Sequence, residues 1–170
     1  MRAPMIVWVV IVLAAVVVFA GGGYVFYQCR SAQKSELADI PPYMMSQQSF
    51  SIDSVSPAAR RSSEDALRTF VSDVYPDSAI VGERFFAAKG HIIGDALRHS
   101  VDDHLTSVSS YELERQGDNP NFYMVWQRGS RLQRFFSDHR IVAVVSAAPA
   151  ESDTADEPIY IYGYFELAPR

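Results

Sequence analysis

The chain contains a single cysteine, Cys29, in 170 residues. One thiol cannot close a disulfide within the chain, so packing and hydrogen bonds alone must hold the fold. The thiol count does not identify the compartment, because domains without disulfides occur on both sides of a membrane. We interpret Cys29 as a thiol without a special role; an intermolecular disulfide and S-palmitoylation are the alternatives.

Sequence patterns of common catalytic sites are also absent. The chain has no His-Glu-x-x-His pair, no Gly-x-Ser-x-Gly and no glycine-rich loop that would bind a phosphate. Two histidines and two carboxylates lie close together, namely His99, Asp102, Asp103 and His104. On a helix, His104 would point away from the direction that His99 and Asp103 share, which makes a poor metal site. We therefore predict a protein that is not an enzyme, with no catalytic residue, no metal and no cofactor.

Basic residues are too few for a nucleic-acid surface. The net charge is −5 at pH 7, and all 20 acidic residues lie after residue 35. A mildly acidic domain lacks the basic stripe that neutralises phosphates, which disfavours nucleic-acid binding. The chain does have one local basic cluster, formed by Arg128, Arg131, Arg134 and Arg140. We interpret this cluster as charge at a strand edge; contact with anionic headgroups or an acidic partner is the alternative.

The feature that the chain does have is a long apolar run, Met5–Tyr27, of 23 residues without a charge. As a helix it would be roughly 35 Å long, which exceeds the bilayer core of about 30 Å. We predict a transmembrane signal-anchor over residues 1–30, with the N-terminus in the cytoplasm and the C-terminal domain in the periplasm or outside. Trp8 at one end and Tyr24 and Tyr27 at the other are the expected membrane-interface residues. A cleaved secretory signal is the alternative.

A linker is predicted over residues 31–62, because this stretch is rich in Ser, Gln and Pro and has no sustained periodicity. Fully extended, a chain of this length could reach up to about 100 Å. Some of its residues are apolar enough to dock on the domain or on a partner: Tyr43, Met44, Met45, Phe50 and Ile52. The soluble domain is expected to occupy residues 63–170.

Two helices are expected at the start of this domain. The first begins at Ser62 or Ser63 as N-cap and ends before Pro76. Its apolar face has helical spacing and comprises Leu67, Phe70, Val71 and Val74. The second is expected over Glu83–Thr106, with a break near Gly90. Its core-facing stripe repeats every four residues and comprises Ile93, Leu97, Val101 and Leu105.

From Val108 onward the hydrophobic period changes to two, which predicts strands. The expected strands are Ser109–Arg115, Phe122–Trp126, Leu132–Phe136, Ile141–Val145 and Ile159–Leu167. Arg128-Gly129-Ser130 is expected to be a tight hairpin connection, and Ile141–Val145, apolar on both faces, should be a central strand. Helices followed by strands predict an α+β fold, with two or three helices packed on one face of a four- to five-stranded, mainly antiparallel sheet.

The last expected strand carries a row of tyrosines. Ile159, Ile161, Phe165 and Leu167 share one face and should meet the helices, whereas Tyr160, Tyr162, Tyr164 and Glu166 share the other. Tyrosine gives a large rigid contact area with one polar tip, so Tyr160, Tyr162, Tyr164 and Trp126 are the predicted partner-binding residues. The alternative is a second sheet face that the linker or a neighbouring segment covers.

These patterns lead to a hypothesis at the level of function class. We expect a single-pass, membrane-anchored module that binds another protein, as a non-catalytic subunit, assembly factor or inhibitor in a bacterial cell-envelope complex. The alternative is a small-ligand-binding or hydrolytic domain with an aromatic-lined pocket, in which His99, Asp103 or Glu166 would converge.

Overall fold

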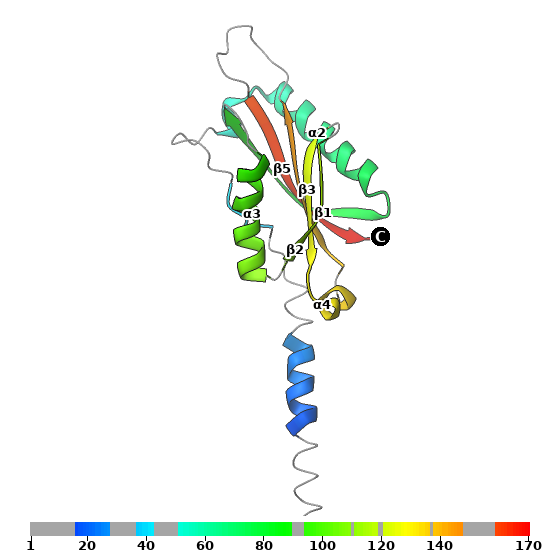
Figure 1. The fold of residues 1–170 in the computed structure, drawn as a ribbon. Helices are drawn as coiled ribbons and strands as arrows, with labels where there is room; N and C mark the ends of the chain where they lie inside the picture. Colours follow the sequence, from blue (N-terminus) through cyan, green and yellow to red (C-terminus); the bar gives the residue numbers. More distant parts are fainter. Residues whose placement is uncertain are drawn as a thin grey trace, which may run out of the picture.

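The computed structural model describes residues 16–27, 37–42, 51–89, 94–109, 111–118, 121–136, 138–147 and 159–170. Along the domain the elements are η1 (Ile52–Ser54), α2 (Pro57–Val74), β1 (Ser78–Lys89), α3 (Gly94–Ser109), β2 (Tyr111–Gly117), β3 (Phe122–Arg128), α4 (Arg131–Phe136), β4 (Arg140–Ala147) and β5 (Ile159–Pro169). The five strands form one sheet in the order β1-β5-β4-β3-β2, and every neighbouring pair is antiparallel (Figure 1). The predicted α+β class is therefore confirmed, and so is the central position of Ile141–Val145 within β4.

The two long helices lie on opposite faces of the sheet (Figure 1). Leu67 and Val71 of α2 pack with Val142 and Phe165 on one face. The α3 face has its own core, which includes Leu97, Val101, Leu105, Trp126, Ile141, Tyr162 and Tyr164. The prediction of helices on a single face is wrong, because both faces of the central strands carry large apolar or aromatic side chains that must be covered.

The segment expected to begin the second helix is a strand. β1 pairs with β5 along its length, from Ser78 opposite Pro169 to Lys89 opposite Ile159. Phe85 meets Phe165 edge-on at 5.5 Å on one face, and Phe86 stacks on Tyr162 at 5.3 Å on the other. The helix itself begins only at Gly94, and its predicted stripe is confirmed at Leu97, Val101 and Leu105, which are fully buried. Ile93 lies outside the described residues.

The prediction of a hairpin at Arg128-Gly129-Ser130 followed by a strand at Leu132–Phe136 is also wrong. These residues instead form the short helix α4, whose first turn is closed by the Arg134 amide donating to the Ser130 carbonyl at 3.0 Å. A Cβ on Gly129 would lie 2.6 Å from Oε1 of Glu112 on β2, so a larger residue at this position would require the exposed Glu112 side chain to move.

α2 starts earlier than predicted. Ser56, not Ser62 or Ser63, is the N-cap, and its hydroxyl accepts from the Ala59 amide at 3.4 Å. Pro57 follows at the first helical position, where its missing amide hydrogen costs nothing. The C-terminal end before Pro76 agrees with the prediction, since α2 ends at Val74 with Tyr75 as C-cap.

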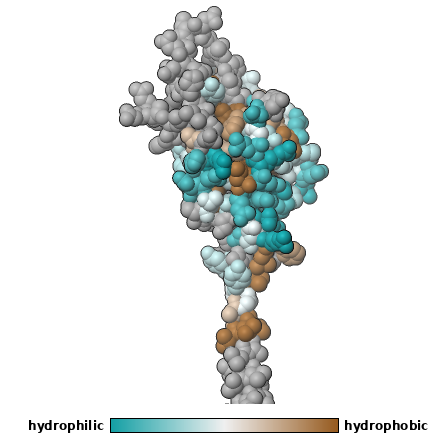
Figure 2. Space-filling view, in the orientation of Figure 1, coloured by the Kyte–Doolittle hydropathy of each residue, from teal (hydrophilic) through white to brown (hydrophobic). Residues whose placement is uncertain are grey.

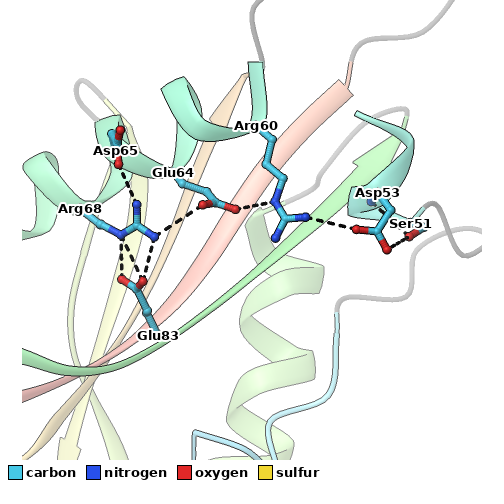
Figure 3. A network of polar contacts seen from close by, with 7 residues as sticks. All are labelled: Ser51, Asp53, Arg60, Glu64, Asp65, Arg68 and Glu83. Atoms are coloured by element: carbon cyan, nitrogen blue, oxygen red, sulfur yellow. Dashed lines mark hydrogen bonds and ion pairs between the residues drawn. The ribbon is translucent and has the colours of Figure 1, made fainter. Parts of the chain in front are cut away.

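An ionic network fastens α2 to β1 and η1 (Figure 3). Arg68 of α2 binds Glu83 of β1 at 2.8 Å, and Glu64 bridges Arg68 and Arg60. Arg60 continues the network to Asp53 of η1 at 3.2 Å. Hydrogen bonding to Glu83 raises the pKa of Arg68, although burial opposes this shift. Because these groups are partly exposed, they orient α2 more than they stabilise it.

Residues 16–27 form a helix that Figure 1 draws apart from the domain. Its side chains are exposed, Phe19 at 80% and Phe26 at 68%. Trp8 and the rest of the apolar run before residue 16 lie outside the described residues. In the part of the chain that the structure describes, no helix is both long enough and apolar enough to cross a membrane. The predicted transmembrane signal-anchor is therefore not supported there.

Candidate functional site

Residues 37–42, which we call the tether segment, pack on the α3 face of the sheet although the sequence predicts a linker there. Leu37 is 6% exposed and Ile40 is 1% exposed, and both belong to the core that contains Tyr162 and Tyr164. Two buried aliphatic side chains hold this segment to the sheet through the hydrophobic effect.

Arg84 of β1 binds the backbone of the tether segment. Its Nη1 donates to the carbonyl oxygens of Leu37 at 3.0 Å, Ala38 at 2.7 Å and Ile40 at 2.9 Å. The same guanidinium lies over the Phe86 ring, 4.9 Å from its centroid. A charged donor shared by three carbonyls of one turn is a strong, geometrically specific contact. We call Arg84, with the carbonyls that it binds, the clamp.

Gly82 provides the space for Leu37. The register between β1 and β5 shifts between Ile80 and Gly82, so the strand has a bulge at this point. A Cβ on Gly82 would lie 2.8 Å from Cδ2 of Leu37, closer than unbonded carbons approach. Glu166, opposite Gly82 on β5, is buried, and its Oε1 lies 3.0 Å from Nδ1 of His139. The bulge and the missing side chain together form the seat for the tether segment.

An aromatic cluster lies beneath the tether segment. Tyr164 meets Tyr162 edge-on at 5.7 Å and Phe86 at 5.5 Å, and its hydroxyl donates to the Pro41 carbonyl at 3.3 Å. Burial raises the pKa of Tyr164 far above its ordinary value, the charge of Tyr162 adds to this, and Arg84 opposes it. Tyr164 therefore stays a neutral hydrogen-bond donor.

The residues predicted to bind a partner lie inside the domain. Tyr162 and Tyr164 are buried, Tyr160 is half-buried, and Trp126 is fully buried under α3, where its indole Nε1 donates to Asp102. The rings of Tyr162, Tyr164 and Trp126 are inaccessible while α3 and the tether segment stay in place, whereas Tyr160 keeps part of its surface exposed. The alternative weighed from the sequence, a second face covered by the linker, is the arrangement that the structure has.

The structure does not bring together the polar residues expected to converge in a ligand pocket. It also does not gather the predicted membrane-interface residues into one described site. His99 and Asp103 are exposed on α3, whereas Glu166 is buried in β5 beside His139. Among the described residues no group of three or more His, Cys, Asp or Glu could hold a metal ion. Tyr24 and Tyr27 are exposed on the helix of residues 16–27, and Trp8 and Cys29 lie outside the described residues.

Sequence reasoning missed the residues that make this site, Leu37, Ile40, Gly82 and Arg84. The only signal was weak: Leu37 and Ile40 are two aliphatic residues three apart in a polar stretch, which is the spacing of one helical turn. Comparisons of the chain with protein-family models, with curated proteins and with solved structures returned no significant match.

The raised pKa of Tyr164 predicts a loss of stability in alkali. Its contribution is fully present below the unfolded-state pKa of about 10 and is lost as the pH rises above that value, because the folded protein holds the proton more tightly. Urea titrations at pH 10 and pH 11 measure how steeply the free energy of unfolding falls with pH. The slope for Tyr164→Phe should be shallower than the slope for the natural protein by up to about 1.4 kcal/mol per pH unit. Identical slopes in the two proteins would contradict this assignment.

Proposed function

We propose that this chain is a single-pass membrane-anchored protein whose domain is a non-catalytic module that holds another protein close to the bilayer. The observation that carries the proposal is the clamp. With residues 37–42 fixed to the sheet, only residues 28–36 separate the domain from the exposed apolar helix of residues 16–27. Nine residues reach at most about 30 Å. The domain would thus stay close to the membrane surface, and a long flexible linker would not separate the two.

The membrane attachment within this proposal is supported by the uncharged 23-residue run Met5–Tyr27. Its described part is helical and exposes Val16, Val17, Phe19 and Phe26. Exposed aliphatic and aromatic side chains in this number are unfavourable in water and favourable in lipid. A subunit, an assembly factor or an inhibitor of a cell-envelope complex are the roles that suit such a module.

The partner surface in this proposal is the outer edge of β2, because the tyrosine face is already occupied. β2 is the last strand of the sheet, and its backbone pairs only with β3 among the described strands. Its exposed side chains are polar and carry both signs of charge on Glu112, Glu114 and Arg115, beside the neutral Gln116. Such an edge can accept a strand of a partner, while its charges and its bulge between Leu113 and Arg115 oppose pairing with unrelated strands.

Photo-crosslinking in the cells that produce the protein tests both parts of this proposal. A benzophenone amino acid in place of Gln116 on β2 is expected to give one defined adduct in the carbonate-washed membrane fraction. The matched control replaces Asp73, which is exposed on α2, and is expected to give none. A chain that leaves the membrane in carbonate would contradict the anchor. A retained chain without an adduct at positions 112, 114 and 116 would contradict the β2 surface.

A further inference from the structure

The tip of α4 presents an exposed aromatic ring between two arginines. Phe135 is 82% exposed, more than any other large apolar side chain in the described residues. Arg131 is exposed and Arg134 is half-exposed on the same short helix. Gln133, by contrast, is 5% exposed and turns into the domain. One side of α4 is thus anchored, and the other carries an apolar ring and positive charge outward.

The position of α4 points to what it meets. Figure 1 draws α4 at the end of the domain that faces the helix of residues 16–27. At this end Figure 2 shows apolar surface directly beside strongly hydrophilic surface. The nine residues 28–36 keep residue 37, where the tether segment begins, within about 30 Å of that helix. If the helix is in a bilayer, as the proposed function has it, α4 is the described part of the domain that faces the headgroups.

The charges around α4 fit an anionic surface. Arg140, the first residue of β4, is already paired with Glu114 at 3.1 Å and with Asp138 at 3.6 Å. Arg131 and Arg134 therefore supply the outward positive charge of the tip. Each arginine near an anionic leaflet strengthens attachment roughly fivefold, and a phenylalanine ring on an interfacial helix is favoured at the boundary between headgroups and acyl chains.

We propose that Arg131, Arg134 and Phe135 form a contact surface for anionic lipid headgroups, with the Phe135 ring inserted at the bilayer interface. This inference rests on the membrane attachment in the proposed function, and it adds a second point of contact. Two contacts, the apolar helix and the α4 tip, would fix the orientation of the domain on the membrane, which one tether cannot do.

The test uses the full chain with Cys29→Ser, reconstituted into vesicles, and an environment-sensitive nitrobenzoxadiazole dye on Phe135→Cys. In vesicles of three parts phosphatidylcholine to one part phosphatidylglycerol, the emission should move to shorter wavelength and brighten. Pure phosphatidylcholine vesicles should give a clearly smaller change, and Arg131→Glu with Arg134→Glu should abolish it. The same dye on Ser62→Cys, an exposed position on α2, is the control and should not respond.

Flotation of the vesicles in a density gradient separates the two possible failures. A chain that floats with the vesicles but whose dye at position 135 does not respond would overturn the lipid contact and leave the anchor intact. An equal response in neutral vesicles would overturn the role of the arginines. A response that requires an added protein would assign the α4 tip to a protein partner instead. A chain that does not float would overturn the attachment and this contact together.

Discussion

Replacing Arg84 by leucine is expected to lower the free energy of unfolding by about 2–3 kcal/mol and to release residues 37–42 from the sheet. The guanidinium donates to three carbonyls of one turn. Leucine leaves those carbonyls without their donor, and two of the three contacts are partly buried. Urea denaturation of the full chain in detergent measures the stability. Limited proteolysis between residue 28 and α2 measures the release, because a free segment is cut faster.

Two variants make this experiment specific for the clamp. Arg98→Leu removes a surface arginine that binds Asp102 at 3.2 Å one helical turn away, and it should cost about 0.5 kcal/mol without faster cleavage. Arg84→Lys keeps the charge but not the planar group over Phe86, so it should restore part of the protection. Equal cleavage of Arg84→Leu and the natural protein would mean that the clamp does not hold the tether segment.

Replacing Trp126 by alanine is expected to destabilise the domain by about 3–5 kcal/mol. The indole is fully buried and lies in the core formed with α3. Its Nε1 also donates to Asp102, which fixes the position of α3 on the sheet. The truncation leaves a large cavity and removes the donor from a carboxylate that is only 24% exposed. A thermal or urea unfolding curve of the full chain measures the loss.

Matched variants separate the two contributions of Trp126. Trp126→Phe keeps most of the ring but loses the donor, and it should cost about 1–3 kcal/mol. Phe135→Ala removes an aromatic ring that is 82% exposed and should change stability by less than about 0.5 kcal/mol. A small effect of Trp126→Ala would argue that Trp126 lies on a surface, as the sequence alone suggested.

The strands were predictable from the sequence where one face of the sheet differs from the other. The alternation in β5 correctly assigned Ile161 and Phe165 to one face and Tyr162 and Tyr164 to the other. What covers the tyrosines was not predictable, because the covering residues Leu37 and Ile40 lie more than 120 residues away in a stretch without periodicity. Nothing local distinguishes a docked turn from a linker.

β1 and α4 show where local patterns fail. β1 carries Glu, Arg, Lys and Ala, which favour helices, and apolar residues on both faces, which hide the period of two. Its pairing with β5, some 80 residues later in the chain, decides the conformation. α4 follows Arg128-Gly129-Ser130, a triplet typical of a hairpin connection, yet these residues lead into a helix whose first turn is closed by the Arg134 amide donating to the Ser130 carbonyl. In β1, tertiary contacts therefore override local propensity.

The place of β5 in the sheet also sets an order of events during synthesis. β5 lies between β1 and β4, its residues 161–167 are buried, and it is synthesised after the other four described strands. Neither β1 nor the seat of the tether segment can be completed before β5 has been synthesised, because β1 pairs with β5. The apolar N-terminal run therefore emerges, and meets any targeting machinery, while the domain is still unfolded.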